Sequence, residues 1–141
     1  MEGIERCDFV SLIVRNIPRA VRFYQETLGL HLRFSQEEQY ALFQIGGMKL
    51  ALQQARPAGP GLPVAHDLVA PTLESGISVL LAFAVKDVDR WCAILRERGV
   101  PILREPADYH WGDREFSVCD PDGHVLIFYG RAQEEAVQSA A

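Results

Sequence analysis

Residues 109–114, with the sequence YHWGDR, hold the densest group of side chains in the chain that could bind or act on a ligand. Trp111 has a flat ring that can stack on a planar molecule or attract a cation, and Arg114 can grip a carboxylate with two parallel hydrogen bonds. These residues predict a ligand-contacting segment just before a strand. The structural alternative is that Trp111 packs against a sheet while Arg114 pairs with Glu115 or Asp113 on the surface.

The same segment contains His110, whose imidazole titrates near neutral pH and could serve as a metal-free general base with Asp108 or Asp113. No partner nucleophile or oxyanion site accompanies it in the sequence. The histidines are scattered over expected turns, loops and strand ends, where surface or structural roles are usual: His31, His66, His110 and His124. A Ser/His/Asp pattern, a glycine-rich phosphate loop and metal-finger spacing do not stand out.

Residues 119–130, CDPDGHVLIFYG, form the clearest structural signal. Pro121 presets φ for a turn, while Asp120 and Asp122 can bond their own backbone. Gly123 can adopt a positive φ, and the residues after it are β-branched, aromatic and leucine-rich. The segment therefore predicts a tight turn that leads into a buried strand.

Two parts of the chain repeat one another. A weaker copy of this turn and strand occupies residues 46–53, and residues 11–24 resemble 82–95 in running from a strand through a cap into a helix. We therefore expect one domain, residues 1–141, made of two related halves. Its parts are a first module at about 6–54, a proline-rich connector at 55–75, a second module at about 76–130, and a polar, alanine-rich tail at 131–141 that is either a loose helix or disordered.

Each half shows the pattern of a strand, a helix and further strands. Asn16 and Asp87 suit helix N-caps, and Gly29 and Gly99 suit the positions just after each helix. The expected helices are residues 17–28 and 88–98, and the expected strands are residues 9–14, 30–34, 40–45, 48–53, 77–85, 101–105, 114–119 and 124–129.

Composition indicates a compact soluble protein, with 141 residues, 48% hydrophobic and 23% charged residues, and a net charge of −5. Phosphate recognition needs clustered Lys and Arg, which the chain lacks, so nucleic acid is not expected as a partner. Cys7, Cys92 and Cys119 have no CxxC spacing, and we expect reduced thiols in an intracellular protein. Residues 1–8 lack the apolar core of a signal peptide, and the longest apolar run, residues 79–85, is too short to span a membrane. These features predict a cytoplasmic protein without a membrane partner.

The paired halves, the opening VSLIVRNIPRAVRFYQETLGL and the closing WGDREFSVCDPDGHVLIFYG resemble the glyoxalase/bleomycin-resistance/extradiol-dioxygenase superfamily, which has the vicinal oxygen chelate fold. The resemblance extends from about Asp8 to Gly130. It implies an α+β fold of two βαβββ modules whose strands curl into an open cup, usually completed by homodimerisation. A homodimer is therefore expected.

In that family, enzymes hold a divalent metal with one residue from the first strand and one from the fourth strand of each module, typically His, Gln or Glu. The matching positions here are Phe9, Ala51, Leu80 and Ile127. Divalent cations need N, O or S ligands, and these side chains supply none. A shift of one residue finds only apolar neighbours: Val10, Leu50, Leu52, Leu81, Leu126 and Phe128. We expect no metal and no cofactor, and the departure argues against the family's metal-dependent activities.

Alternation along the expected strands separates two faces. One is uniformly large and apolar, as a helix-covered core face should be: Val10, Leu12, Val14, Leu50, Leu52, Leu81, Phe83, Val85, Leu126 and Phe128. The other mixes small, polar and apolar residues: Phe9, Ser11, Ile13, Lys49, Ala51, Gln53, Leu80, Ala82, Val125, Ile127 and Tyr129. The mixed face suits a mostly apolar ligand cleft with a few orienting polar groups. The alternative is that a partner subunit or the connector closes it.

The first functional hypothesis is a metal-independent small-molecule-binding protein of the bleomycin-resistance type, which sequesters its ligand in an apolar cleft and thereby gives antibiotic resistance. The candidate ligand-binding residues are Phe9, Ser11, Ala51, Gln53, Leu80, Ala82, His110, Trp111, Arg114, Ile127 and Tyr129. The second is a glyoxalase-superfamily enzyme, of lyase, isomerase or dioxygenase type, that uses acid/base chemistry at His110 or Tyr129 or an unrecognised metal site. The third is a structural or regulatory dimer whose cleft is filled by side chains. No residue in the sequence names the ligand.

Overall fold

The computed structural model describes residues 2–132. The chain divides into two compact units, residues 1–75 and 76–141, and each unit contains a strand, a helix and three further strands. The expected α+β fold of two βαβββ modules is thereby confirmed, with two open mixed sheets. The expectation for tail residues 133–141 lies outside the described residues.

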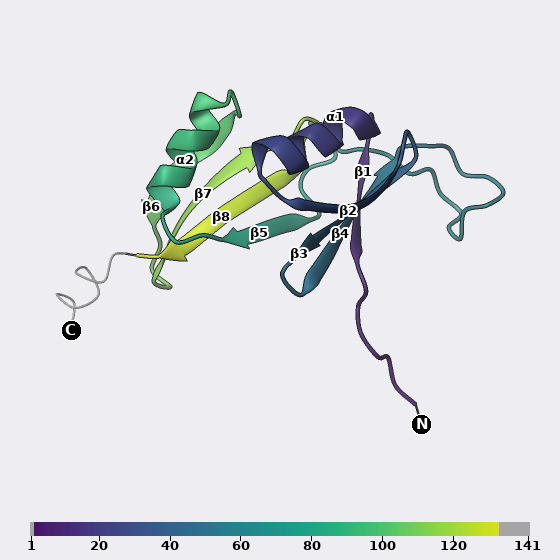
Figure 1. Cartoon of the computed structure of the whole chain (residues 1–141), viewed down its shortest axis with the longest axis horizontal. Coiled ribbons are helices and arrows are strands. Elements are labelled where there is room, and N and C mark those ends of the chain that lie inside the picture. The colour runs from purple at the N-terminus through teal and green to yellow at the C-terminus, as the bar shows by residue number, and fades with distance from the viewer. Residues whose placement is uncertain (1, 133–141) are drawn as a thin grey trace. The chain divides into compact units, whose positions relative to one another are not determined.

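The first unit builds a four-stranded sheet in the order β1-β4-β3-β2, with the helix α1 packed against β3 and β4 (Figure 1). β1 runs parallel to β4, whereas the β4–β3 and β3–β2 pairs are antiparallel. The element bounds are β1 Val10–Val14, α1 Ile17–Arg22, the π-helical turn η1 Phe23–Thr27, β2 His31–Gln36, β3 Tyr40–Ile45 and β4 Met48–Gln54.

The helix of the first unit starts where the sequence predicts and then changes form. Asn16 caps it, because its side-chain oxygen accepts a hydrogen bond from the backbone N–H of Arg19 at 2.9 Å. After six α-helical residues the chain widens into a π-helical turn. The Leu28 N–H closes this turn by donating a hydrogen bond to the Phe23 carbonyl at 3.0 Å. The expected single α-helix is therefore wrong in its second half. The wider turn buries Phe23 and Tyr24 side by side, with ring centroids 5.1 Å apart.

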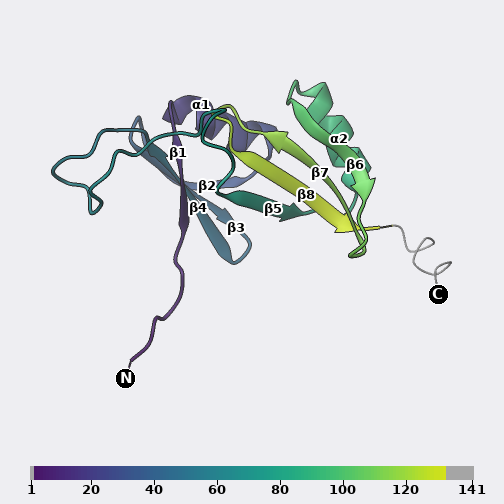
Figure 2. The same ribbon diagram turned by 180° about the vertical axis from the view of Figure 1, so that it is seen from behind.

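The second unit repeats this plan with the strand order β5-β8-β7-β6 and a helix, α2, against β6, β7 and β8 (Figure 2). β5 is parallel to β8, whereas the β8–β7 and β7–β6 pairs are antiparallel. The element bounds are β5 Leu80–Ala84, α2 Val88–Glu97, β6 Ile102–Asp108, β7 Asp113–Cys119 and β8 Val125–Arg131.

A stack of aromatic rings forms the core beneath α2. Phe128 of β8 lies 5.2 Å from Phe116 and 5.5 Å from Trp91 between ring centroids, with nearly parallel planes. Phe83 of β5 adds a third neighbour at 5.3 Å. Along each strand these residues alternate with those of the opposite face. The residues that the sequence predicts to face the helix are therefore the ones that pack beneath α2.

Gly130, near the end of β8, allows an unusually close backbone approach. A Cβ built there would lie 2.6 Å from the carbonyl oxygen of Val85 and 3.2 Å from Val88. Any larger residue would push apart the end of β8 and the segment that leads into α2.

The predicted turn between β7 and β8 is confirmed in detail. The buried carboxylate of Asp120 accepts hydrogen bonds from the backbone N–H groups of Asp122 and His124, each at 2.9 Å. Gly123 takes a φ of +96°, which side-chain-bearing residues rarely adopt. The turn fixes where β8 begins and hence which residues face the helix.

Most strand boundaries lie within two residues of the prediction, and two differ from it by three residues. β5 begins at Leu80 rather than at residue 77, because Leu80 pairs with Val125, the first residue of β8, and no partner strand extends further. β6 continues to Asp108 through Pro106, which the sequence indicated as a strand end. Register shifts on both sides of Arg104 accommodate the proline on this edge strand.

The connector, residues 55–75, forms a single antiparallel bridge, between Arg56 and Leu68, among its otherwise irregular residues. Arg15 after β1 donates a hydrogen bond to the carbonyl of Pro71 at 2.5 Å. Within residues 2–132, no helix is both long and apolar enough to cross a membrane.

Candidate functional site

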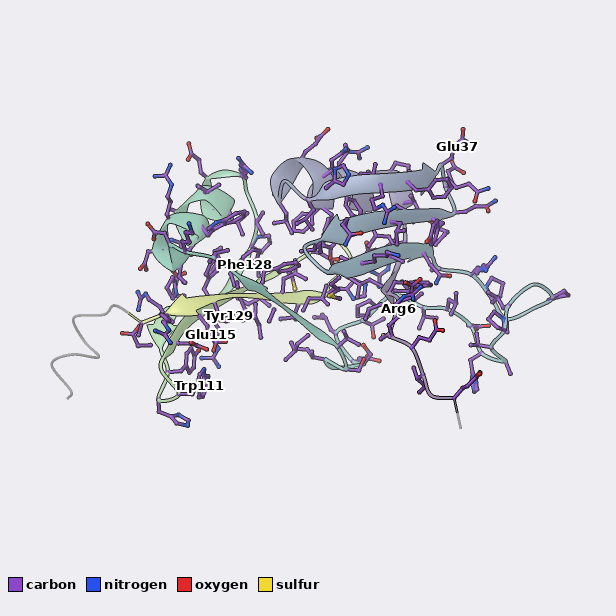
Figure 3. All side chains as sticks on the ribbon, turned by 60° about the horizontal axis from the view of Figure 1, so that its bottom comes forward. Arg6, Glu37, Trp111, Glu115, Phe128 and Tyr129 are labelled. Carbon is purple, nitrogen blue, oxygen red and sulfur yellow. The ribbon has the colours of Figure 1, made fainter. Side chains whose placement is uncertain are left out.

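The strand registers decide which side chains share a face. In the second unit Glu115 pairs directly with Tyr129, and Ser117 pairs with Ile127. Because Phe128 packs beneath α2, these four residues lie on the other side of the sheet. Figure 3 shows Glu115 and Tyr129 close together, on the opposite side of β8 from Phe128. We call the side of each sheet away from its helix the open face.

The most developed group on the open face of the second unit is the aromatic hairpin, residues 109–112, which joins β6 to β7. Tyr109 and Trp111 are stacked with centroids 4.7 Å apart and planes 15° apart, and His110 meets the indole edge-on at 4.7 Å. The indole Nε1–H of Trp111 donates to Glu115 Oε2 at 2.7 Å. Trp111 nevertheless keeps 55% of its surface exposed. The hairpin therefore presents an aromatic ring whose orientation is already set.

Gly112 makes this hairpin possible. Its φ of +97° reverses the chain, and its N–H donates to the Tyr109 carbonyl at 3.0 Å. The Tyr109 N–H donates to the Asp113 carbonyl at 2.8 Å, which closes the loop at its base.

Arg114 lies on the opposite face from Glu115, against α2. Its Nε and Nη2 donate to the two carboxylate oxygens of Asp89 at 3.0 and 2.8 Å, and its Nη1 donates to Asp108 at 3.0 Å. These hydrogen bonds lower the pKa of Asp89 and raise the pKa of Arg114. The alternative pairing with Glu115 or Asp113 is wrong, because adjacent strand residues point to opposite sides of the sheet.

The open face of the first unit has a neutral polar contact. Gln53 Nε2 of β4 donates to Ser11 Oγ of β1 at 2.8 Å, and both side chains are partly buried. Next to them on the same face, Tyr40 of β3 pairs with Gln53 in register. Phe34 of β2 lies 5.9 Å from Tyr40 between ring centroids, so this face also carries two aromatic rings.

Two basic side chains reach the first open face: Arg33 of β2, which donates to Gln44 Oε1 at 3.1 Å, and Lys49 of β4. Lys49 Nζ lies 3.3 Å from Asp8 Oδ1, just before β1, and Nε of Arg6, which is labelled in Figure 3, lies 3.3 Å from the same oxygen. Hydrogen bonds from Lys49 and then Arg6 lower the pKa of Asp8. The lysine charge is therefore already balanced within the unit.

The structure separates the predicted binding residues into groups. In the first unit Ser11 pairs with Ala51, and in the second Ala82 pairs with Ile127. Ala51 is fully buried. Phe9 and Leu80, at or just before the start of the first strand of each unit, are about half exposed. The remaining predicted residues are Gln53, Tyr129, Trp111 and His110 on or beside the open faces, and Arg114 on the helix side.

Sequence reasoning missed some residues of these faces: Phe34, Tyr40, Tyr109 as a stacking partner, and Glu115. Glu115 has a readable signal, since it adjoins core-facing Phe116 and must therefore point away from the helix. Phe34 and Tyr40 become neighbours only when β2 and β3 are paired through the turn at residues 37–39, whose first residue, Glu37, has a φ of +41° (Figure 3).

The described part of the chain lacks a group of side chains arranged as a metal centre. The four strand positions Phe9, Ala51, Leu80 and Ile127 carry only carbon beyond the backbone. Within residues 2–132, no three His, Cys, Asp or Glu side chains gather as they would around a metal ion. These residues therefore do not fit a divalent cation.

Comparison with known proteins adds a family and a set of relatives. The sequence model of the "Glyoxalase/Bleomycin resistance protein/Dioxygenase superfamily" matches residues 6–128. The uncharacterized protein YraH of Bacillus subtilis (strain 168) is 30% identical over 122 residues, covering 85% of this chain and 94% of YraH. A solved glyoxalase/bleomycin resistance protein/dioxygenase from Nocardioides is similar with 25% identity and a TM-score of 0.76, covering 95% of this chain and 88% of that one. TnmS3, an antibiotic binding protein from Streptomyces sp. CB03234, is similar with 25% identity and a TM-score of 0.69, covering 94% and 100%.

Proposed function

The chain belongs to the Glyoxalase/Bleomycin resistance protein/Dioxygenase superfamily, and from that premise we propose that it is a binding protein that sequesters a flat aromatic small molecule without a bound metal. The observation that carries this proposal is the exposed indole of Trp111, held between the Tyr109 ring and the Glu115 carboxylate. A ring fixed in this way loses little conformational freedom when a ligand stacks on it. TnmS3, described as an antibiotic binding protein, supports the same class of function.

Charge favours a neutral or cationic ligand at this point. Glu115 places a carboxylate beside the indole, whereas Asp113, two residues before it on the same face of β7, pairs in register with Arg131. Glu115 also pairs in register with Tyr129, whose hydroxyl is a donor or acceptor for a polar group of the ligand. An anionic ligand that stacks on the indole would have to approach the Glu115 carboxylate and would be repelled.

Apolar side chains complete the proposed binding surface. Ile127 and Ala82 pair across β8 and β5, and half-exposed Leu80 precedes them. The first unit carries a separate, smaller apolar and neutral polar surface on its own open face, at Phe9 and the Ser11 to Gln53 contact. We include a homodimer in the proposal, since a second copy would shield these faces from water.

Metal-dependent chemistry is not part of the proposal. The four positions that hold a metal in enzymes of this family carry apolar side chains here, so no reaction step is derived through a metal. The acid/base alternative depends on His110 or Tyr129. Within residues 2–132, the structure gives His110 no hydrogen bond or ion pair that would orient it as a base.

The proposal is tested by calorimetric titration of the tag-free protein with proflavine, a flat tricyclic cation, and with pyrenesulfonate, a flat polycyclic anion. We expect proflavine to bind with a dissociation constant of about 1–50 μM and the anion to bind at least about tenfold more weakly. Trp111→Ala should weaken proflavine binding, whereas Leu73→Ala, at a fully exposed apolar residue of the connector, should not.

Two results would overturn the proposal. One is the absence of saturable binding of either probe at millimolar concentration. The other is proflavine binding that survives Trp111→Ala unchanged, because the indole would then take no part in the site.

A further inference from the structure

We propose that Arg114 is a positioning residue, which holds the aromatic hairpin in its binding orientation by tying the base of the hairpin to the first turn of α2. The inference rests on the proposed function, since its importance depends on the hairpin being the ligand contact. It assigns to Arg114 a task different from direct contact with a ligand carboxylate.

The contacts of Arg114 connect three elements. Asp108 is the last residue of β6, Arg114 is the second residue of β7, and the hairpin residues lie between them. Asp108 and Arg114 also pair in register, so their side chains leave the sheet on the same side. The guanidinium reaches from that point to both carboxylate oxygens of Asp89 in α2. A side chain on one face thereby fixes a loop that presents its rings on the other.

The hairpin needs such a tie because β6 is an irregular edge strand. Its pairing with β7 shifts register twice, on both sides of Arg104, and most of its residues are exposed. The last regular pairs before the hairpin are Ala107 with Glu115 and Asp108 with Arg114. Edge strands with interrupted pairing open more easily than central strands, so a link to α2, which is anchored in the core by Val88, Cys92 and Leu95, restrains this end of the sheet.

The link acts on Trp111 through Glu115. Glu115 follows Arg114 directly and accepts the indole N–H on the open face. Fixing the backbone at Arg114 therefore fixes the carboxylate that orients the ring. The Gly112 carbonyl also accepts a hydrogen bond from the Ala132 N–H at 3.0 Å, which holds the tip of the hairpin but does not reach α2.

Only arginine meets the geometry of this contact. Three of its nitrogen atoms donate at once, two to Asp89 and one to Asp108. A lysine at this position keeps the charge but presents a single ammonium group, which cannot reproduce the planar fork. Arg114→Lys should therefore behave like a loss of the tie, and not like a conservative change.

A matched control lies on the same side of the same unit. Arg96 of α2 forms an ion pair with Glu105 of β6, which also joins the helix to the edge strand. This pair does not touch the base of the hairpin. Glu105→Gln and Asp89→Asn each remove the negative charge of a carboxylate that pairs with an arginine. An effect that appears only with Asp89→Asn is therefore due to where the ion pair lies, and not to the loss of one charge.

The experiment uses fluorine NMR of protein labelled with 5-fluorotryptophan. The chain has two tryptophans, so two resonances are expected, and Trp111→Phe assigns them. Trp91, stacked on Phe128, reports on the core beneath α2. We expect Asp89→Asn, Arg114→Gln and Arg114→Lys to shift or broaden the Trp111 resonance and to weaken proflavine binding about fivefold, with the Trp91 resonance retained. Glu105→Gln should change neither resonance and should alter binding by less than about twofold.

The outcomes are distinguishable from failure of the proposed function. If the wild-type protein does not bind proflavine, the binding proposal fails while the Trp111 resonance still tests the tie. An unchanged Trp111 resonance in Asp89→Asn and Arg114→Gln would overturn the inference, as would an equal effect of Glu105→Gln. Should Arg114→Gln lose the Trp91 resonance through misfolding, Asp89→Asn decides, because it leaves the Asp108 contact in place.

Discussion

The two units share a strand order but differ on their open faces. In the first, a neutral amide and hydroxyl, Gln53 and Ser11, meet in a partly buried hydrogen bond. In the second, an exposed indole is anchored by a carboxylate, Trp111 on Glu115. The cores beneath the two helices are alike in being apolar and tightly packed. One topology thus tolerates different chemistry on its open face, because the core on the helix side must exclude water.

The largest expected effect is on stability, and it compares two neighbouring residues of β8 that lie on opposite faces of the sheet. Phe128→Ala should lower the free energy of unfolding by about 3–5 kcal/mol, since it leaves a cavity among Phe83, Trp91 and Phe116. Tyr129→Ala, one residue along and on the open face, should cost no more than about 1 kcal/mol. Urea denaturation of both variants provides the measurement. Equal losses would mean that the open face is as essential to folding as the core.

A smaller effect on stability is expected from substitutions at Gln54 and Gly130, which occupy equivalent positions in the two units but differ in residue type. Gln54 pairs with Val14 in the first unit, and its amide donates to the Arg15 carbonyl at 2.7 Å. Gly130 holds the corresponding place in the second unit, against the Val85 carbonyl. Gly130→Ala should therefore destabilise the protein by about 1–3 kcal/mol through backbone displacement.

The matched control for Gly130→Ala is Gln54→Ala. This variant removes one hydrogen bond and should lower the free energy of unfolding by about 1 kcal/mol or less. Thermal and urea unfolding of the two variants give the comparison. A Gly130→Ala protein as stable as wild type would show that the close approach to Val85 relaxes without cost.

Binding affinity should distinguish the two open faces. Trp111→Ala should weaken proflavine binding about tenfold, because it removes the stacking surface, with unfolding free energy changed by less than about 0.5 kcal/mol. Phe34→Ala removes a similarly exposed ring from the first unit and should change affinity by less than about twofold. Calorimetric titration of both variants is the measurement, and equal losses would place the first open face in the binding site as well.

The pH dependence of the Arg114 contacts gives a smaller effect. Arg114→Gln should lower stability at pH 7 by about 0.5–1 kcal/mol, a modest value because Asp89 is largely exposed. The folded-state pKa of Asp89 lies below its unfolded value, so this contribution is present above about pH 4 and is lost as the pH falls through the lowered pKa.

The difference in unfolding free energy between wild type and Arg114→Gln should therefore be constant from about pH 7 to about pH 5 and should shrink below about pH 4. Urea denaturation at several pH values measures it. A difference that instead disappears between pH 7 and pH 5 would point to a titrating group other than Asp89.

The smallest expected effect is that of added metal ions on the melting temperature. Tag-free protein should contain less than about 0.1 equivalent of metal by plasma mass spectrometry, and Ni²⁺, Zn²⁺, Mn²⁺ or Fe²⁺ should not raise its melting temperature, since a ligand that binds only the folded state must stabilise it. Near one bound equivalent would mean that Phe9, Ala51, Leu80 and Ile127 are not the positions that matter, and an enzymatic function would then become the leading proposal.

Local chemistry explains which parts of the fold could be predicted. The Asp120 to Gly123 turn and the Asn16 cap depend on neighbours within four residues, and both form as expected. The period-two alternation of strand residues likewise separates the two faces correctly. The π-helical turn at η1 and the path of β6 through Pro106 depend on packing against distant strands, and the sequence pattern missed both.

The site is harder to predict because its contacts join distant residues. Arg114 and Asp89 are 25 positions apart, and their contact requires α2 to lie across β7 in one register. The Trp111 to Glu115 contact spans only four positions, but it depends on a hairpin whose length the sequence does not fix. Residue types thus identify the segment that carries the chemistry, whereas strand pairing decides which side chains act together.

The location of the aromatic hairpin also bears on how this protein could change over generations. The hairpin joins two strands at the margin of its sheet, and its rings do not contribute to the core beneath α2. Substitutions at residues 109–112 other than Gly112 can therefore alter which molecules are held while folding is preserved. New ligand preferences could be acquired there one residue at a time, with the inherited scaffold left intact.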